Sequence, residues 1–214
     1  MPFRRPRREG RVGACWQGRD GRRRSAARRH GGILIRVLFA AAAAWVLTGL
    51  AGPAAAQLRG HGGPVRALAI SPDGFRAVSG SFDQSAVLWS IEDGVAREVR
   101  RFHDGAVHAV AFVPDGAFLS GGEDGRIALW RAGVPKPVRV FTEHAGPVVA
   151  LAVSPDGRDL ASASWDGTAR IRPLSGGEGR ALEGHAGNVN AVAFLPDGRL
   201  VSAGSDLTLR IWSA

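Results

Sequence analysis

The sequence predicts an all-β repeat fold of four antiparallel sheets, and three observations support this prediction. One pattern of residues occurs four times in tandem between Gly60 and Ala214. Within each copy, short apolar segments alternate with polar residues, and no helical period appears. Turn-forming residues separate the segments. A fixed period in this size range is typical of repeat architectures.

The first segment of each copy predicts a strand that ends in a tight turn. The copies open on GHGGPVRALAISPDG, FHDGAVHAVAFVPDG, EHAGPVVALAVSPDG and GHAGNVNAVAFLPDG. Their histidines are His61, His103, His144 and His185, at intervals of 42, 41 and 41 residues. Alternating apolar residues after each His indicate a half-buried strand. The Pro-Asp-Gly that follows favours a hairpin turn, because Pro presets φ and Gly accepts a positive φ.

Three further segments complete each copy. The second is a strand of small residues, in AVSGS, FLSGG, LASAS and LVSAG, and the third ends near Trp, in SAVLWSI, RIALWRA, TARIRPL and LTLRIWS. A more polar fourth stretch, in AREVRRF, PVRVF and GRALE, leads to the next copy. Four antiparallel strands in each repeat predict propeller blades. We expect these blades at about 60–102, 103–142, 144–183 and 185–214.

These residues resemble the WD-repeat β-propeller family, whose repeat runs from Gly-His to an ending like Trp-Asp. The resemblance covers residues 58–214. The terminal Asp is not kept, because Ser90, Arg131 and Ser213 follow the three tryptophans. In the third copy Arg172 stands where Trp is expected, which predicts that this blade is the least firmly held.

Each copy also repeats a set of polar residues, and the resemblance implies that they form a structural hydrogen-bond network. The sets are His61, Ser79, Asp83 and Trp89; His103, Ser120, Asp124 and Trp130; His144, Ser162 and Asp166; and His185, Ser202, Asp206 and Trp212. Ser, His and Asp are also the components of nucleophilic catalysis. An active site is needed once, whereas a paired buried network is useful in every blade, so we expect the structural role. The sequence predicts no catalytic, cofactor-binding or metal-binding residue, since equivalent histidines on neighbouring blades do not converge on a metal.

The resemblance further implies that partners bind one face of the propeller. The expected contact residues precede the network Asp or lie near the start of the first strand: Phe82, Glu123, Trp165, Ser205, Arg66, His108, Val149 and Asn190. Phe82 and Trp165 are large aromatics in turns, which suits interface anchors. They would equally suit aromatic side chains that lean over the neighbouring blade, and the sequence leaves both interpretations open.

The formal net charge of +9 does not indicate a nucleic-acid-binding protein. Residues 1–36 hold 12 Arg against Glu9 and Asp20, a net charge of +10. Residues 57–214 hold 16 Lys and Arg against 17 Asp and Glu, a net charge of −1. The repeats therefore have no basic excess with which to neutralise phosphates.

The N-terminal region predicts export. Residues 1–36 form a basic leader, and 37–56 supply a short apolar stretch that ends in Ala54-Ala55-Ala56. These are the parts of a secretory signal peptide, so we expect cleavage after Ala56 and a periplasmic or secreted protein. The alternative is an uncleaved leader that anchors the chain to the inner membrane, which would be its only membrane contact.

The leader is longer than a signal peptide needs, and the remaining N-terminal signals are weak. We expect a misassigned start codon, with initiation near Leu34 or Val37. The apolar residues that should follow a twin-arginine pair are replaced by His30-Gly31-Gly32, which argues against that export signal. The only cysteine is Cys15, so the exported chain has no disulfide, and without Cys-x-x-Cys-His it can attach no haem.

The repeat count predicts an incomplete ring. The fourth copy stops after its third strand, and Gln57–Arg59 is too short to supply the missing one. Open blade edges favour self-association or a place in a longer protein. The sequences of the repeats, which follow a predicted export leader, are similar to those of bacterial periplasmic proteins in which a WD-repeat propeller precedes a cytochrome c domain.

Two functions follow from the sequence. The first is a non-catalytic, exported scaffold for protein–protein interaction, with no enzyme activity. The alternative is the truncated N-terminal propeller portion of a periplasmic c-type cytochrome in electron transfer. In that case haem would belong only to a missing C-terminal domain.

Overall fold

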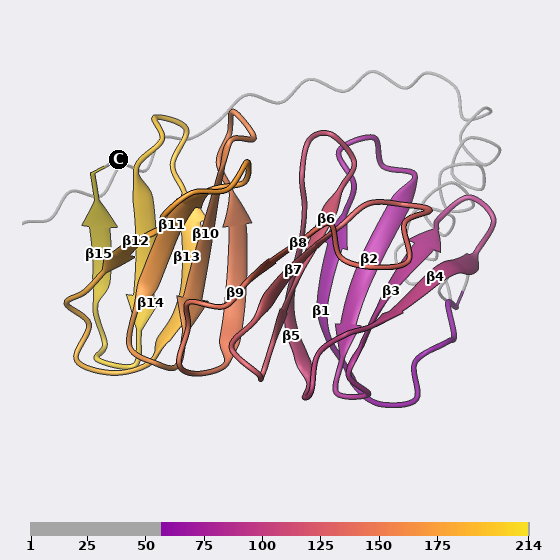
Figure 1. Cartoon of the computed structure of the whole chain (residues 1–214), viewed down its shortest axis with the longest axis horizontal. Coiled ribbons are helices and arrows are strands. Elements are labelled where there is room, and N and C mark those ends of the chain that lie inside the picture. Colours follow the sequence, from indigo (N-terminus) through magenta and orange to yellow (C-terminus); the bar gives the residue numbers. More distant parts are fainter. Residues whose placement is uncertain (1–56, 214) are drawn as a thin grey trace, which may run out of the picture. The chain divides into compact units, whose positions relative to one another are not determined.

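In the computed structural model, which describes residues 57–213, the chain forms fifteen strands in four antiparallel sheets (Figure 1). No helix occurs in this range, and therefore none that is long and apolar enough to cross a membrane. The all-β prediction with four antiparallel sheets is confirmed. The expectations for the basic leader, the apolar stretch and cleavage after Ala56 lie outside the described residues.

Each sheet corresponds to one repeat and is called a blade here. Blade 1 contains β1 (Val65–Ile70), β2 (Arg76–Ser81), β3 (Ser85–Ser90) and β4 (Val95–Arg101). Blade 2 contains β5 (Val107–Phe112), β6 (Phe118–Gly122), β7 (Ile127–Trp130) and β8 (Arg139–Phe141). Blade 3 contains β9 (Val148–Val153), β10 (Asp159–Ser164), β11 (Ala169–Pro173) and β12 (Arg180–Leu182). Blade 4 contains β13 (Val189–Phe194), β14 (Leu200–Gly204) and β15 (Leu209–Trp212).

The strands of every blade pair in chain order, so consecutive strands are hydrogen-bonded neighbours. The Pro-Asp-Gly turns join the first two strands, as the sequence predicts. In blade 1 the Gly74 N–H donates to the Ser71 carbonyl at 2.9 Å, and Gly74 has a φ of +77°. The Asp73 carboxylate accepts the Phe75 N–H at 2.9 Å, which closes the turn locally.

The hydrophobic core lies between successive blades. We call the face of a blade that meets the next blade its forward face, and the opposite face its rear face. Ala86 and Leu88 on the forward face of blade 1 pack with Val107 and Phe118 on the rear face of blade 2. The same pairing of faces joins blade 2 to blade 3 and blade 3 to blade 4. Each inner blade is therefore held by apolar contacts on both of its faces.

One close approach between blades depends on glycine. A Cβ added to Gly80 on β2 would lie 2.7 Å from Cγ1 of Val107, which is fully buried at the start of β5. Real Cβ atoms do not come that close, so a side chain at this position would push blade 2 away. The small residues of the second segment thus allow the next blade to pack closely.

The tight turn before the third strand contains a strained residue in blade 4. Leu207 has a φ of +64° and its side chain is 97% exposed, whereas the equivalent residues in blades 2 and 3 are Gly125 and Gly167. The left-handed region destabilises a non-glycine residue by about 1–2 kcal/mol. Glycine removes this strain, but its greater conformational entropy in the unfolded chain offsets part of the gain. Leu207→Gly should therefore raise the free energy of unfolding by up to about 1 kcal/mol in urea titration. Leu207→Ala keeps the strain and should show no gain; an equal gain in both would contradict the prediction.

Candidate functional site

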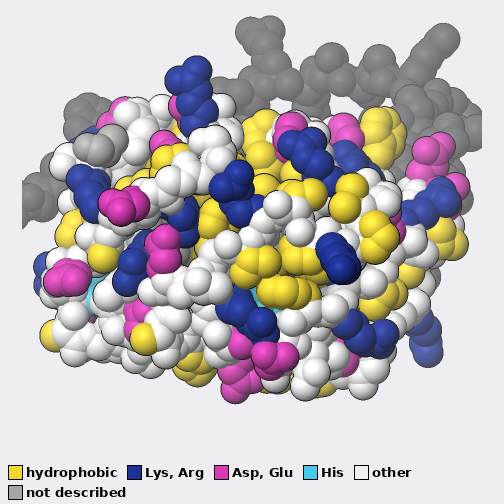
Figure 2. Space-filling view, in the orientation of Figure 1, with side chains coloured by type: hydrophobic (Ala, Val, Ile, Leu, Met, Phe, Trp, Pro, Cys, Tyr) yellow, Lys and Arg dark blue, Asp and Glu magenta, His cyan; other side chains and the backbone are white. Residues whose placement is uncertain are grey.

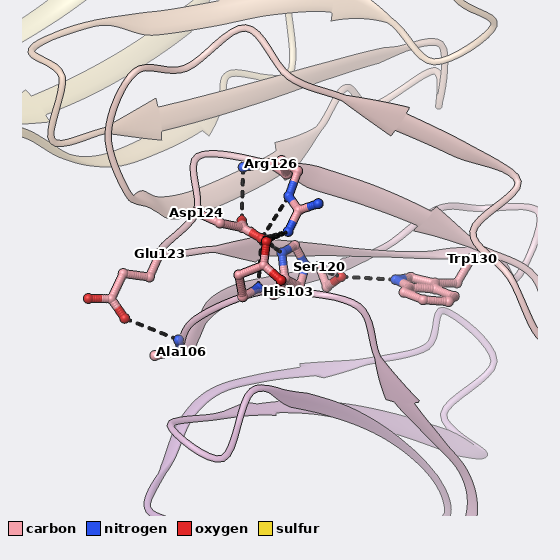
Figure 3. Close-up of polar contacts among 8 residues, drawn as sticks. His103, Ala106, Ser120, Glu123, Asp124, Arg126 and Trp130 are labelled. Carbon is pink, nitrogen blue, oxygen red and sulfur yellow. Dashed lines mark hydrogen bonds and ion pairs between the residues drawn. The ribbon is translucent and has the colours of Figure 1, made fainter.

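The repeated polar residues form a directed chain of hydrogen bonds, shown for blade 2 in Figure 3. Trp130 Nε1 donates to Ser120 Oγ at 2.9 Å, and Ser120 Oγ lies 2.9 Å from His103 Nε2. His103 Nδ1 lies 3.0 Å from Asp124 Oδ1. An indole N–H can only donate, so the Ser hydroxyl donates onward to Nε2 and leaves the imidazole proton on Nδ1 for the carboxylate. The network joins the segment just before β5, both middle strands and the turn between them.

The same chain recurs with little change. In blade 1 the Trp89–Ser79, Ser79–His61 and His61–Asp83 distances are 2.7, 2.7 and 3.0 Å. In blade 4 the distances of Trp212–Ser202, Ser202–His185 and His185–Asp206 are 2.8, 2.8 and 2.9 Å. Blade 3 keeps His144–Ser162 at 2.8 Å and His144–Asp166 at 2.7 Å. The structure therefore brings every predicted network residue together within its own blade.

The geometry of Ser, His and Asp is close to that of a catalytic triad, but a substrate could not reach the serine hydroxyl. The side chains of Ser79, Ser120, Ser162 and Ser202 are at most 4% exposed. In three blades the serine oxygen already accepts a hydrogen bond from tryptophan. A nucleophile must reach a substrate carbonyl, and none of these hydroxyls is open to one. The arrangement can hold strands together, which buried, fully paired networks do well.

Arg172 takes the place of tryptophan in blade 3 in a way that the sequence did not predict. Its guanidinium lies 4.1 Å over the Phe141 ring, and its Nη1 donates to Glu143 Oε1 at 2.5 Å. Its Nη2 donates to the Gly177 carbonyl at 2.6 Å. A partly buried ion pair therefore retains the packing at this position. The contact that blade 3 lacks is the hydrogen bond that an indole N–H would donate to Ser162.

Hydrogen bonds to the network carboxylates lower their pKa values. Burial acts to raise the pKa of Asp83, but donors from Ser85, the Gly62 N–H and His61 outweigh it and hold this pKa well below the usual range. The pKa values of Asp124, Asp166 and Asp206 are lowered by the same balance. Burial lowers the pKa of His144, although Asp166 opposes that shift. These groups are therefore held as carboxylates and, in blade 3, as neutral imidazole.

These pKa directions predict that acid destabilises the fold in two ranges. A group whose pKa is lower in the folded chain than in the unfolded chain stabilises the fold above its unfolded pKa. Stability should therefore begin to fall below about pH 6.5 through His144 and through His108, whose pKa burial also lowers, and fall further below about pH 3.9 through the carboxylates. Urea midpoints measured from pH 8 to pH 3 test this. In His144→Asn the slope between pH 7 and pH 5 should be smaller, and an unchanged slope would contradict the assignment.

The eight predicted partner-contact residues lie at two kinds of backbone feature. Arg66, His108, Val149 and Asn190 each occupy the irregular position of the first strand, where the pairing register with the second strand shifts. Such a bulge turns a side chain away from the regular strand direction. Phe82, Glu123, Trp165 and Ser205 lie in the turns between the second and third strands, and the backbone N–H of each donates to a carbonyl just before the first strand. The bulges, such as the register shift between Val65 and Ala67, were not predicted from the sequence.

Three of these residues form one aromatic cluster across three blades. The ring of His108 on blade 2 lies 5.7 Å from the ring of Phe82 on blade 1 and 5.9 Å from that of Trp165 on blade 3. Phe82 is 52% and Trp165 45% exposed. Burial lowers the pKa of His108, while the nearby charges of Glu123 and Arg66 shift it in opposite directions. We call Phe82, His108, Trp165, Arg66 and Glu123 the aromatic surface.

The other predicted contact residues do not join this cluster. Asn190 and Ser205 are exposed on blade 4, and Val149 is half-buried on blade 3. Glu123 is oriented by the Ala106 N–H, which donates to its Oε2 at 3.2 Å (Figure 3). The aromatic surface thus belongs to blades 1 to 3.

Residues 57–213 contain no group of three or more His, Cys, Asp and Glu side chains arranged to hold a metal ion. On the face shown in Figure 2, basic and acidic side chains are interspersed among hydrophobic ones. That face therefore has no large surface area on which all charged side chains carry the same sign.

Comparison with known proteins agrees with the blade architecture. The family model described as WD domain, G-beta repeat matches residues 52–90, 97–131, 135–172 and 176–213, which is more than half of the chain. The chain belongs to the WD40 repeat family. Proteins of this family generally act as scaffolds for protein interactions.

Several curated WD40 relatives match over part of their length. Methylosome protein WDR77 of Xenopus laevis is 40% identical over 79 residues, 36% of this chain and 24% of that protein. Small ribosomal subunit protein RACK1y of Oryza sativa subsp. japonica is 40% identical over 74 residues, 33% of this chain and 22% of that protein. Tricorn protease homolog 1 of Streptomyces coelicolor is 36% identical over 94 residues, 43% of this chain and 8% of that protein. The chain therefore spans at most about a quarter of these relatives.

Proposed function

We propose that this WD40 chain is a non-catalytic scaffold that binds a protein partner through the aromatic surface. The observation that supports this most directly is the contiguous cluster across three blades, in which half-exposed Phe82 and Trp165 flank the partly buried His108. Turn and bulge backbones hold these rings in place, so a partner would meet a prearranged surface.

The chemistry of the aromatic surface suits a protein partner. Phe82 and Trp165 are rigid, large side chains that gain by burial under a partner, as interface anchors do. The lowered pKa of His108 keeps its ring uncharged at neutral pH, so burying it costs no desolvated charge. Arg66 and Glu123 supply one charge of each sign beside the rings, as expected for a polar rim.

The two interpretations of Phe82 and Trp165 describe one arrangement. Both rings lean on His108, and about half of each ring remains open to solvent. Contact with the neighbouring blade orients the ring, and the open part is free to bind.

The test is capture of a partner in the native cell by a photo-crosslinking residue. Placed at Phe82, it should enrich a defined protein, and Trp165→Ala should reduce that enrichment at least tenfold. The matched control is Phe75, which is 63% exposed in the turn at the opposite end of the same blade. Equal enrichment from both positions, or a large loss of thermal stability in Phe82→Ala/Trp165→Ala, would overturn the proposal.

We further propose that the protein is exported. Support comes from the basic leader, the apolar stretch from Val37 and the Ala-x-Ala site that ends at Ala56. N-terminal sequencing of the periplasmic fraction should begin at Gln57. A chain that stays in the inner-membrane fraction would favour the anchored form, and any peptide from residues 1–30 would exclude the later start codon.

The second candidate is the propeller portion of a periplasmic c-type cytochrome. Support comes from segments such as SGSFDQSAVLW and ALEGHAGNVNAVAFLPDG after an exported leader. Reading the genomic DNA past codon 214 tests it. An in-frame Cys-x-x-Cys-His would favour electron transfer, and a stop codon in good sequence would favour the scaffold.

A further inference from the structure

In the cleft between blades 1 and 2, the side chain of Arg76 lies against three different groups. This cleft is at the end of the blades that carries the Pro-Asp-Gly turns, opposite to the aromatic surface. Arg76 Nη2 donates to the Asp73 carboxylate at 3.2 Å, and Nη1 lies 3.5 Å from the Gly116 carbonyl oxygen. The guanidinium carbon lies 5.9 Å from the centre of the Phe112 ring. A carboxylate, a carbonyl and an aromatic ring thus surround one guanidinium.

The cleft between blades 3 and 4 keeps all three of these groups but not the arginine. Counted from the Pro-Asp-Gly turns, the positions of Asp73, Gly116 and Phe112 are occupied by Asp156, Gly198 and Phe194. The position of Arg76 is occupied by Asp159. Each of these two residues begins the second strand of its blade, and they pair with Ser90 and Pro173, which are equivalent residues on the third strands. The surroundings of a guanidinium are therefore retained, and a carboxylate replaces the guanidinium itself.

The shorter side chain leaves open space in the cleft between blades 3 and 4. A cavity of about 330 Å³ lies there, and its lining includes Asp159, Phe194 and Gly198. A Cβ added to Gly116 would lie 2.9 Å from Arg76 Nη2, whereas one added to Gly198 would meet nothing within 4 Å in the described part of the chain beyond its immediate neighbours. The two glycines have φ values of +84° and +87°, so the difference comes from the missing arginine and not from the backbone.

The lining of this cavity is negatively charged. It contains the carboxylates of Asp156, Asp159 and Asp197. Two exposed arginines beside it offset part of that charge: Arg158 Nε lies 3.8 Å from Asp156. Arg199 Nη2 lies 2.7 Å from Asp197. One negative charge remains, which favours a cation in the cavity.

The cleft between blades 2 and 3 differs in both respects. It also holds a cavity, of about 360 Å³, but Val153 stands at the position of the aromatic ring. Its lining includes Arg131, a cation of the chain itself. The combination of open space, acidic lining and aromatic ring therefore distinguishes the cleft between blades 3 and 4 from that between blades 2 and 3.

We propose that the cleft between blades 3 and 4 binds the side chain of an arginine presented by a partner protein. The guanidinium lies over Phe194 and pairs with Asp156 and Asp159, as Arg76 pairs within the chain one cleft earlier. A guanidinium suits the site better than an ammonium, because its planar fork donates to carboxylates while its face lies on a ring. The site is separate from the aromatic surface, so either site can fail its test without the other.

Titration of the isotope-labelled chain with the peptide N-acetyl-Gly-Arg-Gly-amide tests this proposal by nuclear magnetic resonance. We expect backbone amide shifts confined to the cavity, including those of Asp159 and Gly198. The same peptide with citrulline in place of arginine is similar in shape but uncharged, and should cause no shifts. The lysine peptide should bind more weakly. Free arginine should also bind more weakly, because its own carboxylate meets the acidic lining; binding as tight as that of the peptide would overturn the assignment to a protein partner.

Substitutions in the two clefts give the sharpest result. Asp159→Arg should abolish the peptide shifts, because the new side chain fills the cleft as Arg76 does in the first one. Glu178→Arg is the matched control, since it makes the same charge change at an exposed position of blade 3 outside the cavity lining, and it should leave the shifts unchanged. Phe194→Leu should weaken binding about two- to fivefold through loss of the cation–π contact.

The reciprocal variant Arg76→Asp should open the first cleft and add a second set of peptide shifts around Gly116. Equal thermal unfolding midpoints show that the variants are folded. A parent chain without localised shifts would overturn the proposal, and so would shifts that persist in Asp159→Arg. Absence of the second set in Arg76→Asp would overturn the equivalence of the two clefts on which the proposal rests.

Discussion

Replacing Trp130 by Ala should lower the free energy of unfolding by about 3–5 kcal/mol, the usual cost of removing a buried Trp. Trp130 is 2% exposed, and its ring stacks on Phe118 at 6.2 Å between centroids. The Arg100 guanidinium lies 5.6 Å from the same ring. The change removes the stacking within blade 2, the contact with Arg100 of blade 1 and also the donor to Ser120. Urea unfolding followed by circular dichroism measures the loss.

Two further variants separate the contributions. Trp130→Phe keeps most of the apolar contact but leaves Ser120 without its indole donor, so it should cost less than Trp130→Ala, with about 1 kcal/mol due to the lost hydrogen bond. Trp165→Ala removes a half-exposed Trp and should cost under about 1 kcal/mol. If Trp130→Ala and Trp165→Ala were equally destabilising, the contrast between the core and the aromatic surface would be wrong.

Replacing Asp124 by Ala should cost about 3 kcal/mol, because several donors lose a charged acceptor at once. Its carboxylate faces His103 Nδ1 at 3.0 Å, accepts the Asp104 N–H at 3.0 Å and accepts Arg126 Nε at 2.8 Å. His103 is buried, so its Nδ1–H would be left without a partner. Thermal and urea unfolding both measure this effect.

Asp115→Ala is the matched control for Asp124→Ala in the same blade. Asp115 lies in the Pro-Asp-Gly turn, where its carboxylate accepts the Ala117 N–H at 3.0 Å and pairs with exposed Arg131 at 2.8 Å. An exposed pair of this kind contributes little, and with the turn hydrogen bond the substitution should cost under about 1 kcal/mol. Equal losses from both aspartates would show that the buried network does not stabilise the blade.

Much of the fold follows from local patterns that the sequence displays directly. Alternation of apolar residues predicts the first strand of each blade, and Pro-Asp-Gly predicts the turn that ends it, because both depend on neighbouring residues alone. The recurrence of His, Ser, Asp and Trp also predicts which side chains act together in a blade. In residues 57–213 strands form within these segments, and in blade 2 His103 and Ser120 lie within hydrogen-bonding distance of each other.

Other features depend on contacts between residues that are far apart in the sequence, and the repeat pattern does not show which of these residues meet. The role of Arg172 depends on Glu143 and Phe141, residues without special status in the repeat, which come within reach only when blade 3 folds. The aromatic surface likewise joins Phe82, His108 and Trp165 from three blades. The sequence pattern identifies these three residues one by one, but it does not show whether their rings meet.

The sequence by itself determined the all-β class, the four repeats, the turns and the composition of each network, because these properties repeat locally and at fixed spacing. Only the tertiary structure decided which residues meet across blades, how the bulge at His108 turns its ring between Phe82 and Trp165, and which faces stay open. The physical reason is that the solvent exposure of a residue depends on which other residues pack against it. Val65 and Val107 occupy equivalent positions in their repeats, and one is exposed and the other buried because a blade packs on only one of them.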